Sequence, residues 1–353
     1  MKIAMVITSL EVGGAEKLVL NLVRELKSKV EIRLFVIRKN YQTIYDRELA
    51  EMDIWYCYLN AGNRLFSVKA YKKLKNMLEK FKPDIIHTHL KAADYIYFYR
   101  PHKKNSKWIH TVHTLADFDA RNLRRFFYRP LYKRRTIIPV PVSEEVEESL
   151  LRLYGIQGRL IPNGVNLEKF RYLPQKKNSF QVLHVGRFVP LKNHRYLLKE
   201  FAKFANKKKD VKLILIGSGP LKKKMKRFAR KLEIVKQVEF IDHAENVEEY
   251  MREACVFVLP SRYEGMSLAL LEALASGLLV ITRRDLSSLI ESEVNGFEID
   301  IEKNALYYEL ENIYQNYDNL EIIRKNASKS ARAFSLKLTA ERYLLLYQET
   351  ANA

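Results

Sequence analysis

The chain has 353 residues, 47% of them hydrophobic, which is enough for two domains with separate cores. No run of eighteen apolar residues occurs, so no membrane-spanning helix is predicted, and two cysteines are too few for a disulfide framework. The formal charge of +21 leaves three anionic partners open: a nucleic acid, a membrane surface or a phosphate-bearing substrate. No nucleic-acid-binding module is recognisable, so we expect no specific nucleic-acid partner. The two cysteines, far apart in the sequence, suggest a reduced compartment, so we expect a cytoplasmic protein.

Strands and helices alternate through the first half of the chain. Apolar, β-branched runs predict strands at residues 2–8, 30–37, 53–59, 84–90, 108–114 and 137–142. This alternation predicts an α/β fold with a doubly wound parallel sheet. Gly13 and Gly14 separate the first strand from the helix that follows it, so we expect their backbone to approach a phosphate group.

Histidines stand at the ends of two predicted strands. His113 closes the strand at residues 108–114, and open α/β sheets bind their ligands at that edge. We therefore expect His113 to donate a hydrogen bond to a substrate. His87 and His89 have a spacing that occurs in metal sites, but no third ligand lies nearby in the sequence. We interpret this pair as strand-end histidines near a cleft.

A basic and aromatic segment precedes the strand at residues 137–142. From Arg100 to Arg135 there are eleven Lys or Arg against two Asp. This mixture is typical of a helix that lies on an anionic membrane. The alternative is a solvated basic helix whose aromatic side chains face the core. The candidates for contact with a membrane or acceptor are Arg121, Arg124, Arg125, Phe126, Phe127, Arg129 and Lys133.

The second half of the chain repeats the pattern. We place the boundary near Pro162, so the predicted domains are residues 1–161 and 162–335, followed by a helical segment at residues 336–353. Arg187 and Lys192 follow a predicted strand and stand five residues apart in one loop. Both cations can therefore converge on a diphosphate.

The stretch at residues 259–282 carries the strongest functional signal. It predicts a strand ending at Pro260, a loop, a helix at about residues 267–276 and a second strand. Glu264 and Glu272 lie about 12 Å apart at this helix, which suits a nucleotide sugar, because carboxylates accept hydrogen bonds from vicinal hydroxyls. The helix N-terminus can hold a diphosphate through the backbone of Gly265, Met266, Ser267 and Leu268.

These features resemble the retaining GT-B glycosyltransferases of family 4. Glu264 and Glu272 match the E-x7-E motif, Arg187 and Lys192 match the G-R-x4-K pattern, and residues 111–114 are similar to the family's histidine segment. The resemblance implies two Rossmann-like domains facing across a cleft, with the acceptor bound by the N-terminal domain and the nucleotide sugar by the C-terminal one. It also implies that the terminal helix crosses back to the N-terminal domain.

The resemblance further implies a role for each candidate. The donor-binding residues would be Gly13, Gly14, Arg187, Lys192, Gly265, Met266, Ser267, Leu268 and Glu272, and the catalytic ones His113, Arg187, Lys192 and Glu264. In these roles Glu272 binds the ribose and Glu264 binds a hydroxyl of the donor sugar. Arg187 and Lys192 bind the diphosphate, and His113 faces the sugar. No cofactor and no metal are expected, since the cations and the helix N-terminus stabilise the leaving diphosphate.

We expect a retaining hexosyltransferase that uses a nucleotide sugar, most commonly a UDP-sugar, and a glycan or lipid-linked acceptor. Bacterial surface polysaccharide or glycolipid synthesis, on the inner face of the plasma membrane, is the expected setting. A non-catalytic GT-B partner subunit, a polyanion or nucleic-acid binder, and a transferase with a small soluble acceptor remain alternatives. One segment departs from the family, because residues 283–289 lack its Gly-Gly and Glu, and Leu279 replaces its usual proline.

Overall fold

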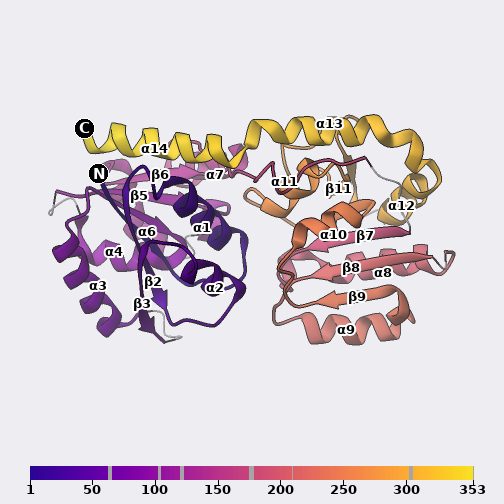
Figure 1. Ribbon diagram of the computed structural model, residues 1–353, viewed down its shortest axis with the longest axis horizontal. Helices are drawn as coiled ribbons and strands as arrows, with labels where there is room; N and C mark the ends of the chain where they lie inside the picture. The colour runs from indigo at the N-terminus through magenta and orange to yellow at the C-terminus, as the bar shows by residue number, and fades with distance from the viewer. Residues whose placement is uncertain are drawn as a thin grey trace. The chain divides into compact units, whose positions relative to one another are not determined.

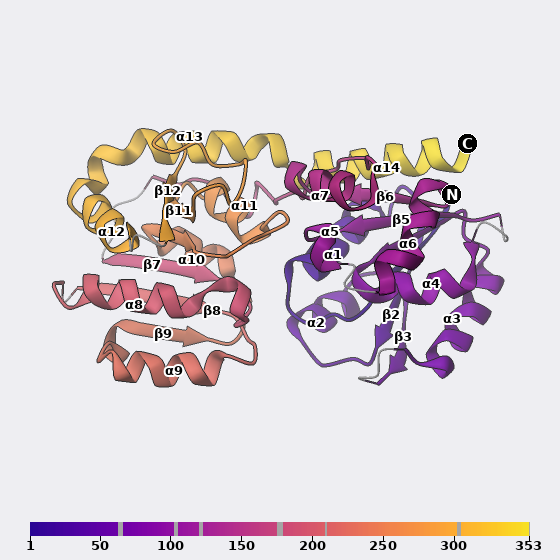
Figure 2. The same ribbon diagram turned by 180° about the vertical axis from the view of Figure 1, so that it is seen from behind.

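The computed structural model describes residues 1–62, 66–101, 105–119, 123–174, 179–208, 210–301 and 305–352, except for the side chains of residues 119, 123 and 124. The chain forms two compact units (Figures 1 and 2). Unit 1 comprises Met1–Asn163 and Leu336–Ala353, and unit 2 comprises Gly164–Ser335. The division before Gly164 falls two residues after the predicted boundary at Pro162.

Unit 1 is built on a six-stranded parallel sheet with the order β3-β2-β1-β4-β5-β6. The strands are β1 (Lys2–Ile7), β2 (Glu31–Arg38), β3 (Trp55–Ala61), β4 (Ile85–His89), β5 (Lys107–Val112) and β6 (Ile137–Pro141). The flanking helices are α1 (Gly14–Leu26), α2 (Ile44–Ala50), α3 (Val68–Phe81), α4 (Ala93–Tyr99), α5 (Ala116–Asp119), α6 (Leu123–Lys133) and α7 (Glu144–Tyr154). The central strands are almost continuously apolar because helices cover the sheet.

The final helix, α14 (Leu336–Asn352), completes unit 1 (Figure 1). It packs on α1 and β4, and the Thr339 hydroxyl donates a hydrogen bond of 3.0 Å to the Pro162 carbonyl. Tyr343 and Tyr347 of this helix are fully buried. Residues near the C-terminus therefore form part of the buried core of unit 1.

Unit 2 has a second parallel sheet, with the order β12-β11-β10-β7-β8-β9. Its strands are β7 (Phe180–Val185), β8 (Val211–Ile216), β9 (Val238–Ile241), β10 (Val256–Leu259), β11 (Leu279–Arg283) and β12 (Phe297–Ile299). Its helices are α8 (His194–Ala205), α9 (Lys222–Lys231), α10 (Val247–Glu253), α11 (Leu268–Ala275), α12 (Ala305–Asn316) and α13 (Glu321–Ala331).

The two sheets share one topology. Counted from its own first strand, each has the order 3-2-1-4-5-6. The direction of winding therefore reverses between β1 and β4 in unit 1 and between β7 and β10 in unit 2. In open α/β sheets, ligands lie at this switch point, outside the carboxyl ends of the strands. The topology thus singles out the loops that follow these four strands.

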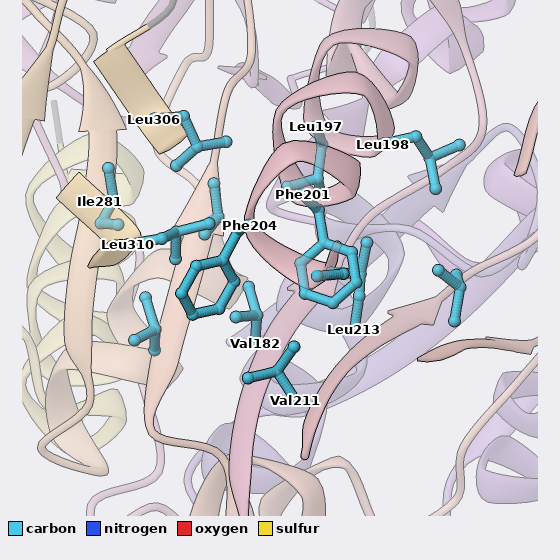
Figure 3. Packing of buried hydrophobic residues seen from close by; sticks show 14 of the residues in the cluster. Val182, Leu197, Leu198, Phe201, Phe204, Val211, Leu213, Ile281, Leu306 and Leu310 are labelled. Carbon is cyan, nitrogen blue, oxygen red and sulfur yellow. The ribbon is translucent and has the colours of Figure 1, made fainter. Parts of the chain in front are cut away.

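Helix α8 anchors the core beside the unit 2 switch point (Figure 3). Leu197, Phe201 and Phe204 recur at helical spacing and are completely buried. They pack with Val182 of β7 and with residues of β8, β11 and α12. Burying each large apolar side chain contributes roughly 1.5–3 kcal/mol, so this cluster holds β7 and the loop after it firmly in place.

Candidate active site

The loop after β7 carries Arg187 and Lys192 and is fastened to the loop after β8. The Phe188 amide donates to the Ser218 carbonyl at 2.7 Å, and the Leu221 amide donates to the Phe188 carbonyl at 3.0 Å. Gly219 has a φ of +143°, and a Cβ there would come within 2.8 Å of the Phe188 amide nitrogen. Only glycine permits this conformation and this close approach. The backbone between the two predicted cations is therefore fixed by contacts outside its own loop.

Lys192 and Glu264 come together at the unit 2 switch point. The Lys192 Nζ donates to Glu264 Oε1 at 2.6 Å, and the two side chains are only 17% and 11% exposed. The Arg262 amide also donates to the Leu191 carbonyl at 3.0 Å, which joins the loops after β10 and β7. The structure thus brings together Lys192, predicted to bind the diphosphate, and Glu264, predicted to bind the sugar, although Glu264 lies 72 residues later in the chain. Such a shielded, charge-assisted contact holds both side chains in a defined position.

Helix α11 begins directly after Glu264 and its loop. Ser267 caps the helix, because its hydroxyl accepts a hydrogen bond of 3.3 Å from the Leu270 amide. The side chains of Met266, Ser267 and Leu268 are buried, so this segment can offer a ligand its backbone rather than its side chains. Glu272 lies in the second turn of the helix.

Gly13 and Gly14 lie where the sequence predicts, at the start of α1. Gly13 is the N-cap residue and Gly14 the first helical residue. The carboxylate of Glu16 occupies the space above Gly13, where a Cβ would come within 2.6 Å of Glu16 Oε2. A buried carboxylate therefore lies beside the N-terminus of α1, where it interacts favourably with the helix dipole.

Three histidines gather near the carboxyl edge of the unit 1 sheet. His113 follows β5 directly, and its Nε2 lies 3.0 Å from Nδ1 of His89, the last residue of β4. His87 hydrogen bonds through both ring nitrogens, to the Tyr347 hydroxyl at 2.6 Å and the Thr111 hydroxyl at 2.7 Å. Burial lowers the pKa of His87 and of His89 well below the ordinary value, and neighbouring histidines lower it further. Both are neutral at physiological pH.

The hydrogen bonds of His87 leave it no nitrogen for a metal ion. Within the described residues, no group of three His, Cys, Asp or Glu is arranged to hold a metal. The interpretation of His87 and His89 as strand-end histidines agrees with these contacts. What sequence reasoning missed is the pairing of His89 with His113, which depends on the register between β4 and β5.

Lys222 is a second residue that sequence reasoning missed. It begins the basic helix α9, but its side chain points inward, where Nζ lies 2.9 Å from both the Gly217 carbonyl and Asp242 Oδ1. Burial lowers the pKa of Lys222, whereas its hydrogen bond to Asp242 opposes that shift. Lys222 thereby ties the loop after β8 to the loop after β9. The helical spacing of buried Lys222, Met225 and Ala229 is the signal that could have revealed it.

Helix α6 contains most of the predicted membrane candidates. Phe126 is 78% and Phe127 47% exposed, whereas Tyr128 and Tyr132 are buried. The alternative in which the aromatic residues face the core is thus correct for the tyrosines and wrong for the phenylalanines. Among the described residues, no helix is long and apolar enough to cross a bilayer. Arg125, Arg129 and Lys133 are exposed, whereas Arg121 and the side chain of Arg124 lie outside the described residues.

Two protein-family models match the chain. The model described as Glycosyltransferase Family 4 matches residues 12–169, and the one described as Glycosyl transferases group 1 matches residues 166–330. Together they span the greater part of both units.

Individual relatives also cover most of the chain. It is 29% identical over 261 residues to UDP-Gal:alpha-D-GlcNAc-diphosphoundecaprenol alpha-1,3-galactosyltransferase of Escherichia coli, covering 66% of this chain and 67% of that protein. It is 24% identical over 374 residues to N-acetylgalactosamine-N,N'-diacetylbacillosaminyl-diphospho-undecaprenol 4-alpha-N-acetylgalactosaminyltransferase of Campylobacter jejuni, covering 98% of this chain and 99% of that protein.

The solved structure of HepE from Anabaena with UDP and glucose has a TM-score of 0.85 at 16% identity, covering 99% of this chain and 100% of that one. This likeness shows the fold alone. The matched models and the strand order that the two units share show that the chain belongs to glycosyltransferase family 4 and has the GT-B fold of two Rossmann-like domains.

Proposed function

We propose that the protein is a retaining, metal-independent glycosyltransferase that moves a sugar from a UDP-sugar to a hydroxyl group of a lipid-linked glycan. The observation that carries this proposal is the meeting of Lys192, Glu264 and the start of α11 at the unit 2 switch point. A nucleotide sugar needs cations and N–H donors for its diphosphate and carboxylates for its hydroxyls, and this edge supplies both.

The names of the two relatives support the donor and the acceptor. Both name a diphospho-undecaprenol-linked acceptor, and one names UDP-Gal as the donor. Both also name an α linkage. Since hexoses are usually α-linked to their nucleotides, an α product supports retention of configuration. A role in surface polysaccharide or glycolipid synthesis follows from an acceptor of this class.

The reaction we propose needs charge stabilisation rather than a protein nucleophile. The acceptor oxygen forms a bond to the anomeric carbon while the bond from that carbon to the diphosphate oxygen breaks on the same face, and the acceptor proton passes to the leaving diphosphate. Arg187 and Lys192 stabilise the negative charge that develops on that diphosphate. The Lys192–Glu264 contact supports this role, because it positions the cation before the donor arrives.

The remaining candidates surround the donor in this proposal. Glu272 binds the ribose, Glu264 a hydroxyl of the transferred sugar, and the backbone of residues 265–268 the diphosphate. Gly13 and Gly14 offer their backbone to the diphosphate, and His113 donates a hydrogen bond to the sugar.

We also propose that the protein lies on the inner face of the plasma membrane through α6. Exposed Phe126 and Phe127 support insertion among lipid headgroups, and exposed Arg125, Arg129 and Lys133 support attraction to anionic lipid. Each basic side chain near such a surface contributes about 1 kcal/mol, so several give reversible binding.

Thermal unfolding with UDP, GDP, ADP and CMP, each with magnesium or with EDTA, tests the donor assignment. A ligand at a hundred times its dissociation constant stabilises the folded state by about 2.7 kcal/mol. We expect UDP to raise the melting temperature equally in both conditions. The anomeric configuration of the product, determined by NMR, then tests retention. A protein that none of these nucleotides stabilises would contradict the proposal and favour a non-catalytic partner subunit.

A further inference from the structure

The contact between His89 and His113 constrains the protonation of both rings. Their facing nitrogens, Nδ1 of His89 and Nε2 of His113, are 3.0 Å apart, so one of them must carry the hydrogen and the other must accept it. His89 is fully buried and neutral, so it carries one hydrogen, on either Nδ1 or Nε2. Which nitrogen carries it determines what His113 can do.

The environment of His89 Nε2 decides between these two tautomers. Among the described residues, this nitrogen is buried and has no hydrogen-bond partner. A hydrogen on Nε2 would be a buried donor without an acceptor, and orphaned buried N–H groups are rare and costly. A hydrogen on Nδ1 is satisfied by His113 and leaves only a lone pair without a partner. The structure therefore favours the tautomer of His89 that donates from Nδ1.

We infer that His89 is a positioning residue that holds His113 as the neutral tautomer with its hydrogen on Nδ1. Because His113 Nε2 accepts the hydrogen bond from His89, it cannot take up a proton while that bond persists. His113 therefore offers an uncharged N–H donor, which suits a sugar hydroxyl better than a phosphate. This inference rests on the proposed function only for the identity of the ligand.

A second layer of hydrogen bonds supports His89 from below. The ring centroid of His87 lies 4.1 Å from that of His89, so the two rings are packed together. His87 is held by Tyr347 and by Thr111, and the Thr111 hydroxyl lies 2.9 Å from the Tyr343 hydroxyl. Two tyrosines of α14 thus fix the ring on which His89 rests. Positioning of His113 begins in the last helix of the chain.

Long-range ¹⁵N–¹H NMR of the histidine-labelled protein at neutral pH tests the inference directly. We expect His113 in the unaltered protein to show a proton on Nδ1 only. His89→Phe keeps a flat ring but removes the N–H donor. The ¹⁵N signals of His113 should then move to values averaged over its two neutral tautomers. His89→Asn should restore the wild-type tautomer, because the amide can donate from a position close to that of Nδ1. A His113 that carries its proton on Nε2, or is doubly protonated, in the unaltered protein would overturn the inference.

Kinetics of the same variants distinguish positioning from a purely structural role. His89→Phe should lower kcat about tenfold, the effect of one hydrogen bond, while KM for the donor stays within about twofold. Tyr95→Phe is the matched control, because it removes the hydroxyl of a buried tyrosine of the same unit, which accepts a hydrogen bond from the Ser67 amide, and leaves the His87–His89–His113 contacts intact. It should change neither the His113 tautomer nor kcat, and equal effects from both variants would contradict the inference. If the unaltered protein shows the expected His113 tautomer but does not bind the donor, the proposed function alone is contradicted.

Discussion

The carboxyl edges of the two sheets have the same topology and opposite chemistry. In unit 2, the edge is charged: Lys192 pairs with Glu264, and Lys222 pairs with Asp242. In unit 1, it is built from rings that hydrogen bond to one another, with His87 and His89 buried and neutral. One strand order thus supports an edge of paired charges in one unit and an edge of neutral, hydrogen-bonded side chains in the other. Part of the difference lies in the strands themselves, because His87 and His89 belong to β4, whereas Lys192 and Glu264 lie in loops that follow their strands.

The charged edge should give the largest mutational effect. Replacement of Arg187 and Lys192 together by alanine removes both cations, and the loss of one such stabilising group costs on the order of 10²- to 10³-fold in kcat. We therefore expect turnover to fall by at least about 10³-fold in an assay of UDP release. Lys226→Ala is the matched control, because Lys226 is an exposed cation of the same unit. Wild-type turnover in the double variant would refute the site.

The second carboxylate of the charged edge should control affinity rather than rate. Glu272→Ala removes the proposed ribose acceptor, and a hydrogen bond to a charged group contributes about 1.5–3 kcal/mol. KM for the donor should rise by roughly ten- to a hundredfold, with a smaller change in kcat. Titration calorimetry with UDP provides the check. An unchanged dissociation constant would remove Glu272 from the donor site.

A basic helix in each unit extends the comparison to membranes. The solvent face of α9 carries more exposed cations than the described part of α6, but α9 has no large exposed apolar side chain among its described residues. Phe126→Ser with Phe127→Ser should therefore weaken binding to vesicles with anionic lipid by about tenfold or more, since insertion of these rings contributes the apolar part of the binding energy. Lys223→Gln with Lys224→Gln in α9 is the control, and cosedimentation measures both. Equal losses would mean that charge alone drives the binding.

The two units should share a sensitivity to mild acid. Burial lowers the pKa of His184 in unit 2 to about 4, as it lowers those of His87 and His89 in unit 1. Because the folded pKa lies below the unfolded value near 6.5, the stabilising effect is complete above that pH and is lost as the pH falls towards 4. Each histidine should cost up to about 1.4 kcal/mol of unfolding free energy per pH unit. Denaturant unfolding at pH 7.5 and at pH 5 measures this loss of stability, and His184→Asn should make the loss smaller. Equal stability at both pH values would contradict the burial of these histidines in the neutral form.

Local patterns in the sequence predicted most of the framework. The alternation of apolar runs and helices predicted all of the strands described here except β12, which has only three residues. Helix α2 was missed, although Thr43 and Asp46 form a capping box at its start. The terminal helical segment was predicted at residues 336–353, and α14 begins at Leu336, where Leu336 and Thr339 are buried against the rest of the unit.

Contacts between distant segments were beyond the reach of those patterns. The motifs located Lys192 and Glu264 separately, but only the order β7-β10 brings their loops together. The orientation of Lys222 was hidden in a run of lysines whose other members face solvent. The His87–Tyr347 contact joins residues 260 positions apart, and no local spacing encodes such a pair.

The return of α14 to unit 1 sets an order for folding during synthesis. Unit 2 is one continuous segment, so all of its residues are made before α14 emerges from the ribosome. Unit 1 lacks Tyr343 and Tyr347 until that moment, and His87 waits for its partner hydroxyl. The nascent chain should therefore complete unit 2 first. A ribosome-stalled chain that stops before Leu336 should resist protease in unit 2 while unit 1 remains open to cleavage.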